Sequence, residues 1–385
     1  GERPVIRRLS ACLLAAAACG PTHADCDEAT CIGDDGPCLG APRIHPTEIS
    51  PLHFVAADFD GDTHVDVLAI GTTIAGAVVA ELHRGGADGQ LADPVPSAAV
   101  GCSAYPIAGD LDGDARADLV YPDCEGNALV FWGDAAGLGA SPSVVDMPFV
   151  FVTSATGDAD GDGIDDLLAF GVADVAQQVL VRGSPSRVLL ADAPHVVEGG
   201  IAASGVRTGD VDGDGILDAV TWAGGQVDTV AIARGLGDGS FTAPQLRTTG
   251  TIAGAVVLGA LDTAPGLELV VASPSQQQLV LDAAMRSHVT AVPPYRPAAL
   301  AIADLAGDVA DDLGAYALAV DGFDPEVRYY ATSPDGALVE HARLPTPHAA
   351  QSVLTPDLDG DGISDVLVGH LAAGAFSLWL SSEWT

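Results

Sequence analysis

Apolar and polar residues along this chain alternate in short runs that are typical of β-strands. In one stretch, VRTGDV leads into an acidic loop, ILDAVTWA leaves it, VDTVAIARG follows, and TAPQLRT comes after the turn LGDGSF. This order predicts four short strands with a tight turn between the third and the fourth. Beyond the N-terminal stretch, no window shows a sustained apolar period of 3.6 residues with helix caps. We therefore expect an all-β chain.

The acidic loop occurs five times in nearly the same form and sets the period of the pattern. It reads DFDGDTHVD from Asp58, DLDGDARAD from Asp110, DADGDGIDD from Asp158, DVDGDGILD from Asp210 and DLDGDGISD from Asp357. Weaker copies start at Ala260 and Asp304, so successive starts lie 52, 48, 52, 50, 44 and 53 residues apart. A period near 50 indicates a repeat architecture. Seven units of four strands predict a seven-bladed β-propeller, which protects its strand edges by radial repetition.

The two ends of the repeat region predict how the ring closes. The last repeat stops after its third strand, GAFSLWLSS, at Thr385. The segment Pro42–Ser50 precedes the first inner strand, where a fourth strand stands in every other repeat. We expect this segment to pair with the last repeat. The alternative is a disordered leader.

Each complete loop carries carboxylates at positions 1, 3, 5 and 9 and glycine at position 4. Four acids within nine residues repel one another, and a bound hard cation neutralises them; oxygen ligands favour Ca²⁺. Glycine permits the tight turn. Position 7 varies, as expected for a residue that donates only its backbone carbonyl. The candidate ligands of about five Ca²⁺ ions are Asp58, Asp60, Asp62, His64 and Asp66; Asp110, Asp112, Asp114, Arg116 and Asp118; Asp158, Asp160, Asp162, Ile164 and Asp166; Asp210, Asp212, Asp214, Ile216 and Asp218; and Asp357, Asp359, Asp361, Ile363 and Asp365.

The loops allow two other interpretations. An EF-hand needs Glu at position 12 and flanking helices, and neither is present here. An acidic turn without metal is the remaining alternative for each copy. It is our expectation for the loop at Asp262, which keeps only Asp262 and Glu268 of the four acids. The loop at Asp304, with Asp308 and Asp312, stays open between the two.

These residues carry a family resemblance. The D-x-D-G-D-G-x-x-D-[LV] loop at a period near 50, with GLGDGSF-type turns, resembles FG-GAP/VCBS repeats from about Pro42 to Thr385. The resemblance implies the seven-bladed, calcium-bound propeller of integrin α subunits and many secreted bacterial proteins. It also implies that the loop joins the two inner strands of a blade and that partners dock on the opposite face. The aromatic candidates for such a contact are Tyr105, Phe149 and Tyr295.

Charge narrows the range of partners. The 15 basic residues are all arginine, against 53 acids, for a formal charge of −38. Five Ca²⁺ would add +10 and leave about −28. Such a surface repels phosphate backbones, so we expect no nucleic-acid partner. No apolar stretch is long enough to span a bilayer.

The first residues are typical of an export signal. Arginines precede the apolar run LSACLLAAAAC, which ends at Cys19. The run resembles a bacterial lipoprotein box, which implies lipidation of Cys19. We therefore expect a signal peptide over 1–19, a polar tether over 20–41 and the propeller over 42–385. The protein is expected to be exported, as an outer-membrane or cell-surface lipoprotein held by its lipid anchor, or secreted. A wrongly assigned start is the third alternative.

Export permits disulfides. Cys102 and Cys124 flank the second loop at similar distances, and antiparallel pairing would bring them together, so we predict a bridge; two buried thiols are the alternative. Three further cysteines lie in the tether, and the sequence does not assign their pairing.

No catalytic motif stands out. The ten histidines are scattered, and no HExxH, G-x-S-x-G or phosphate loop is present. We expect His64 and His83 to be surface groups, and Trp132, Trp222 and Trp379 to serve packing. The sequence therefore favours an exported, calcium-stabilised binding or adhesion module without enzymatic activity, whose ligand is a protein or glycan. The alternative is a calcium-dependent carbohydrate-active enzyme similar to polysaccharide lyases.

Overall fold

The computed structural model describes residues 42–99, 105–123, 125–172, 174–196, 203–223, 227–261, 265–273, 278–283, 287–291, 296–304, 312–318, 326–332, 338–346, 350–370 and 374–381. Over these residues the regular structure is β-strand, in seven four-stranded antiparallel sheets and one two-stranded ribbon. The all-β expectation is confirmed for this part of the chain. Within it, we find no helix with the length and apolar character that a membrane span requires.

The sheets follow one another along the chain, and each takes its strands from one continuous stretch of the chain except the last. Their strands are β2 to β5 (Ser50–Ala57, Asp66–Thr72, Val78–His83, Val95–Ala99); β6, β7, β8 and β11 (Ile107–Gly109, Asp118–Pro122, Ala128–Phe131, Ser143–Val145); β12 to β15 (Val150–Gly157, Asp166–Val172, Ala176–Val181, His195–Val196); β16 to β19 (Gly205–Gly209, Asp218–Trp222, Thr229–Ala233, Gln245–Thr248); β20 to β23 (Ala255–Gly259, Glu268–Ser273, Gln278–Ala283, Ser287–Ala291); β24 to β27 (Arg296–Ala303, Asp312–Leu318, Glu326–Thr332, Leu338–Pro345); and β28, β29, β30 and β1 (Ala350–Leu354, Val366–His370, Ala375–Trp379, Arg43–Pro46). The ribbon joins β9 and β10 (Gly133–Asp134, Gly137–Leu138).

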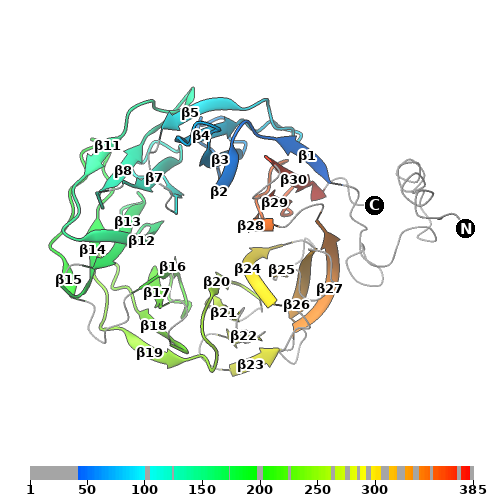
Figure 1. Ribbon diagram of the computed structural model, residues 1–385. Coiled ribbons are helices and arrows are strands. Elements are labelled where there is room, and N and C mark those ends of the chain that lie inside the picture. The colour runs from blue at the N-terminus through cyan, green and yellow to red at the C-terminus, as the bar shows by residue number, and fades with distance from the viewer. Residues whose placement is uncertain are drawn as a thin grey trace, which may run out of the picture.

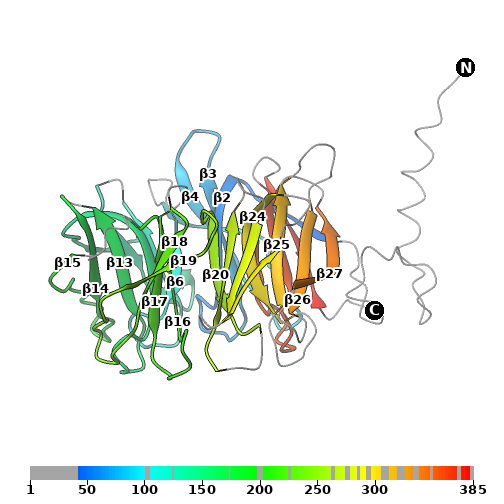
Figure 2. The ribbon, with the colours of Figure 1, turned by 90° about the horizontal axis from the view of Figure 1, so that it is seen from below.

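The sheets are arranged as a ring around a central axis. Figure 1 shows the first strand of each sheet near the centre and the fourth at the periphery, and Figure 2 shows the ring from its edge. Threonine hydroxyls connect neighbouring inner strands: Thr156 Oγ1 donates to the carbonyl of Ala108 at 2.7 Å, and Thr208 Oγ1 donates to the carbonyl of Thr156 at 2.9 Å. These bonds fix neighbouring sheets to one another next to the axis.

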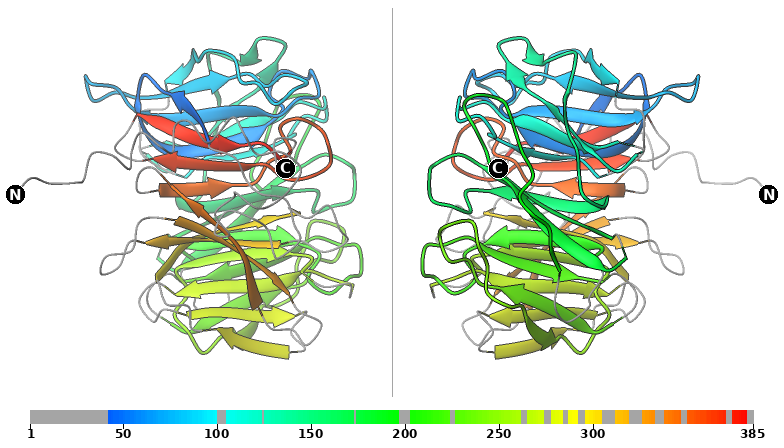
Figure 3. Two further views of the ribbon diagram at one scale, coloured as in Figure 1. Left: turned by 90° about the vertical axis from the view of Figure 1, so that its right-hand side faces the viewer. Right: turned by 90° about the vertical axis from the view of Figure 1, so that its left-hand side faces the viewer.

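The N-terminal strand β1 closes the ring. It pairs antiparallel with β30, from Arg43 opposite Leu378 to Pro46 opposite Ala375, and Figure 3 shows it lying against the C-terminal strands. The pairing predicted for Pro42–Ser50 is confirmed, and the disordered leader is wrong for this segment. The last sheet thus takes three strands from one end of the chain and its outer strand from the other.

The hydrophobic core lies between neighbouring sheets. The second strand of a sheet is buried on both faces, as in β7 and β17, where all five residues are buried. One cluster joins Phe59 and Leu68 of the first sheet to Tyr121 of the second. Trp132, Trp222 and Trp379 are buried in such clusters, which confirms their packing role. The core therefore holds each acidic loop between two packed sheets.

Candidate metal centres

The five complete loops each join the first strand of a sheet to the second, as the resemblance implies. In every one, three carboxylates place an oxygen within 4.8 Å of the other two. No other group of metal-ligating side chains is found in the described part of the chain. The clusters are Asp58, Asp60 and Asp62; Asp110, Asp112 and Asp118; Asp158, Asp160 and Asp166; Asp210, Asp212 and Asp218; and Asp357, Asp359 and Asp361.

Backbone amides fold each loop around its first carboxylate. In the third loop, Gly161 N–H donates to Asp158 Oδ1 at 2.6 Å and Gly163 N–H donates to Asp158 Oδ2 at 2.9 Å. Gly161 has φ of 78° and Gly163 has φ of 88°, which glycine adopts without strain. Ile164 N–H donates to Asp162 Oδ1 at 2.9 Å. The same bonds recur in the other four loops, so one sequence pattern folds in one way.

The position 9 carboxylate has a different set of partners. Asp166 Oδ2 accepts the amide of Ala159 at 3.1 Å, and its Oδ1 accepts the amide of Gly183, just beyond the third strand, at 2.8 Å. The equivalent acids of the other four loops accept the same two amides. All five position 9 side chains are buried. This residue thus connects the loop to the end of the third strand.

Burial makes the charged form of the position 9 acids costly. Burial, followed by repulsion from loop carboxylates, raises the pKa of Asp66, Asp166 and Asp365 to about 6 and that of Asp118 to about 7, although their backbone hydrogen bonds act in the opposite direction. In the remaining loop, the guanidinium of Arg234 contacts Asp218 directly. Each loop thus concentrates negative charge that a nearby cation would stabilise.

Several arginines form ion pairs with the loop carboxylates, and the loop motif did not predict them. Arg84, Arg182 and Arg234 each follow the third strand of their sheet and pair with the position 3 carboxylate of their own loop, with Arg84 Nε 3.6 Å from Asp60 Oδ2. In the second sheet Trp132 takes this place, and Arg187 of the third sheet pairs with the position 3 carboxylate instead. The signal was visible as the recurring dipeptide RG or WG after the third strand. Its glycine supplies the amide for position 9.

The residues fit a hard divalent cation. Carboxylate oxygens are the ligands that Ca²⁺ prefers. In the third loop Oδ1 of Asp160 is buried without a hydrogen-bond partner among the described residues, although Oδ2 of the same group pairs with Arg182. A buried carboxylate oxygen without a partner is costly, and a cation at the cluster would satisfy it.

Hydrogen bonds between loops place them on one face of the ring. The amide at position 8 donates to the position 1 carbonyl of the preceding loop: Ala117 to Asp58 at 2.7 Å and Asp165 to Asp110 at 3.0 Å. Leu267 bonds Asp210 in the same way at 3.0 Å, and Ser364 bonds Asp304 at 2.8 Å. Neighbouring loops are therefore joined directly through their backbones.

The structure places several residues differently from the sequence prediction, and others lie outside its described part. His83 is 1 % exposed, so its assignment as a surface group was wrong: its ring packs edge-on against Phe376 at 5.1 Å between centroids. Phe149 is also buried, within the core between the second and third sheets, and cannot serve as an exposed contact. Tyr105 is 74 % exposed. The following lie outside the described residues: the signal and tether with Cys19, the Cys102–Cys124 bridge, Tyr295, Asp262 and Asp308.

Comparison with known proteins supports the assignment of the fold. No family model and no curated protein matches the chain. Among solved structures, the crystal structure of BBS1N in complex with ARL6DN, soaked with lead, is similar with a TM-score of 0.60 and 11% identity, over 87% of this chain and 92% of that one. A structure of the same complex soaked with mercury has a TM-score of 0.44 and 14% identity, over 73% of this chain and 94% of that one. The first likeness and the ring of four-stranded sheets identify the fold as a β-propeller.

Proposed function

We propose that this chain is an exported, seven-bladed propeller of the FG-GAP/VCBS type, which holds about five Ca²⁺ ions and serves as a binding or adhesion module. One observation carries the metal assignment: five loops of one sequence pattern converge three carboxylates each within 4.8 Å. The carboxylates at positions 1, 3, 5 and 9 would hold the ion, and position 7 would supply its carbonyl. The ion would neutralise charge that opposes the compact state.

The role as a binding module is supported by what surrounds the loops. The described residues present a rigid ring whose sheets are fixed to one another by inter-loop and inter-strand hydrogen bonds. Such a scaffold holds its surface segments in fixed positions, as recognition requires. A propeller of this fold occurs in complex with a protein in the BBS1N–ARL6DN structure, so the fold is compatible with this role.

Calcium titration of the chelator-treated protein tests the metal assignment. We expect about five ions, with affinities of ~10⁻⁴–10⁻³ M as in other extracellular modules. Because calcium would bind the native state only, it should raise the melting temperature, and excess chelator should lower it. Two or fewer bound ions, or a melting curve that does not respond to chelator, would refute structural calcium.

A further inference from the structure

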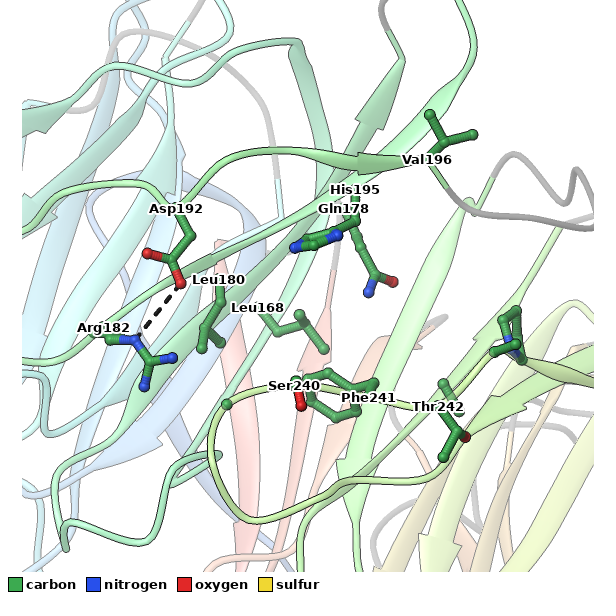
Figure 4. A pocket seen from close by; sticks show the side chains of 14 residues that line it. Leu168, Gln178, Leu180, Arg182, Asp192, His195, Val196, Ser240, Phe241 and Thr242 are labelled. Atoms are coloured by element: carbon green, nitrogen blue, oxygen red, sulfur yellow. Dashed lines mark ion pairs between the residues drawn. The ribbon is translucent and has the colours of Figure 1, made fainter.

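A groove lies between the third and fourth sheets at the rim of the ring. Its volume is about 520 Å³, within the ~300–1,000 Å³ of small-molecule sites. Leu168 and Leu180 form its apolar floor together with Phe241, which comes from the neighbouring sheet. Figure 4 shows Gln178 and His195 on one side and the segment with Ser240 and Phe241 on the other.

The pairing of the outer strand is irregular beside this groove. The outer strand β15 pairs with β14 only at His195 and Val196, and contact with β14 resumes at the isolated bridge between Val181 and Ala191. The intervening segment 192–194 is one residue longer than the stretch opposite it in β14, and it stays attached to the sheet because Asp192 N–H donates to the carbonyl of Leu180 at 2.9 Å. Because Gln178 and His195 are directly opposite each other in β14 and β15, their side chains lie on the same face.

The charged groups of the groove neutralise each other. Arg182 Nε lies 3.5 Å from Asp192 Oδ2, the ion pair drawn in Figure 4. The same guanidinium pairs with Asp160 of the calcium loop and donates to the carbonyl of Asp238 at 3.0 Å. The charges of Arg182 and Asp192 therefore offset each other within the groove, which favours a ligand without net charge.

The polar groups of the groove outside this ion pair remain available to a ligand. Among the described residues, neither the amide of Gln178 nor the imidazole of His195 has a hydrogen-bond partner, and both line the groove. The Thr242 hydroxyl accepts the amide of Arg234 at 3.0 Å and keeps its own proton to donate. An amide offers both a donor and an acceptor and an imidazole ring has two polar nitrogens, and these groups can pair with the hydroxyl groups of a sugar, which also donate and accept.

We propose that this groove binds a neutral saccharide, with a sugar ring lying on the apolar floor beside Phe241 and its hydroxyls paired with Gln178 and His195. An apolar floor with a few uncharged donors and acceptors at its edge matches a ring that has apolar faces and hydroxyls around its rim. The inference rests on the proposed role as a binding module and names its ligand class. The site lies beside the loops, and thus differs from the opposite face that the family resemblance implies.

The groove is also attached to a calcium loop. The turn that carries Ser240 and Phe241 is fixed by Gly239, whose amide donates to the carbonyl of Ala159, at position 2 of the third loop, at 2.9 Å. Arg182 makes a second link between that turn and the loop. Order in the loop from Asp158 therefore supports one wall of the groove, and we expect calcium to strengthen saccharide binding.

A glycan array of neutral, uronate-containing and amino-sugar members, probed with the labelled protein in millimolar calcium, tests the proposal. We expect binding to neutral members. For the best of them, Gln178→Ala and His195→Ala should each weaken binding about three- to tenfold, the loss expected from one hydrogen bond. Leu190→Ala is the matched control, because Leu190 is 75 % exposed in the same segment of the chain and does not line the groove.

The melting temperature with and without calcium, recorded on the same samples, separates the two proposals. A calcium-dependent melting temperature without binding to any neutral glycan would overturn the groove and leave the metal assignment in place. Neutral binding that Gln178→Ala and His195→Ala leave unchanged, or a preference for charged glycans, would also overturn it. Binding that these variants weaken, in a protein whose melting does not respond to calcium, would support the groove and refute structural calcium.

Discussion

The loop from Asp210 and the loop from Ala260 occupy equivalent places in neighbouring sheets, but only the first keeps all four acids. Both keep the position 9 contact: Val211 N–H donates to Asp218 Oδ2 at 3.0 Å, and Leu261 N–H donates to Glu268 Oε2 at 2.8 Å. Asp218 and Glu268 are both 1 % exposed. The position 9 acid therefore belongs to the framework of the sheet and persists where the acids at positions 1 and 5 are gone.

The two loops differ in their turns as well as in their acids. All five complete loops have positive φ at positions 4 and 6, and the amide at position 6 donates to the position 1 carboxylate. In the other loop, position 6 is Pro265, which has no N–H and a φ fixed near −65°. In the described part of this loop, positive φ occurs at position 7, where Gly266 has φ of 96°. The loss of metal ligands thus accompanies a different backbone path.

The largest effect should come from removing a position 9 acid. Asp218→Ala leaves two buried amides, those of Val211 and Gly235, without their acceptor and leaves Arg234 without its buried partner. We expect a loss of about 2–4 kcal/mol in the free energy of unfolding, in chelator as well as in calcium. Urea denaturation in both conditions measures it.

Asp214→Ala is the matched control in the same loop. At position 5 its carboxylate accepts the amide of Ile216 on the exposed surface, so its loss should matter chiefly through the metal. We expect a cost of about 1–2 kcal/mol in calcium at roughly ten times the dissociation constant and almost none in chelator. Equal costs for the two variants in chelator would show that position 9 has no separate structural role.

A smaller effect should follow from a buried group that lacks the hydrogen bonds of the position 9 acids. His83 Nε2 is buried without a hydrogen-bond partner among the described residues. Burial, and then the nearby His45, lowers the pKa of His83 from 6.5 to about 4. Since the folded pKa lies below the unfolded one, the stability from neutral His83 is present above pH 6.5 and is lost as the pH falls toward 4, by up to about 3 kcal/mol.

His83→Phe removes this titration and keeps an aromatic ring against Phe376. The urea midpoints of the unmodified protein and the variant are measured in saturating calcium at pH 7, 6 and 5. The titration of the loop acids is the same in both proteins, so it cancels in the difference between the two midpoints. We expect the variant to gain relative to the unmodified protein with each step down in pH. If the difference in urea midpoint stays constant over this pH range, the pKa of His83 is not lowered on folding, and the prediction is wrong.

Much of this fold was predictable because its repeats are local in sequence. The period near 50, the order of strands and the pairing of Pro42–Ser50 with the last sheet all follow from the spacing of one motif, and the structure bears out the strands and the pairing. The convergence of positions 1, 3 and 5 in the loop from Asp58 was also predictable, since glycine at position 4 permits the tight turn that brings these carboxylates together.

The rest depends on contacts between sheets, which no single repeat reveals. His83 precedes an arginine in the dipeptide pattern, yet it is buried, and its ring packs against Phe376, which comes from the other end of the chain and also stacks on His45. Phe149 looked like a loop aromatic, but it fills the core between two sheets. The groove at Phe241 likewise needs side chains from two sheets, so it could be found only in the folded ring.

The smallest expected effect is the gain of a sixth ion in the loop from Ala260, and it tests the comparison most directly. If missing acids were the whole difference, Ala260→Asp with Ala264→Asp would create a site. We expect this double variant to bind no further ion, because Pro265 cannot donate the position 6 amide or adopt positive φ.

Adding Thr263→Gly and Pro265→Gly should permit the turn of the complete loops, while Glu268 keeps its bond to Leu261. This variant should bind one more ion in a calcium titration and gain about 1 kcal/mol of stability in calcium. In chelator it should be less stable than the unmodified protein, since the two new carboxylates repel each other. A sixth ion in the double variant would show that the ligands alone define the site. Failure of the quadruple variant to bind one, with its fold intact, would show that the loop needs support from outside its nine residues.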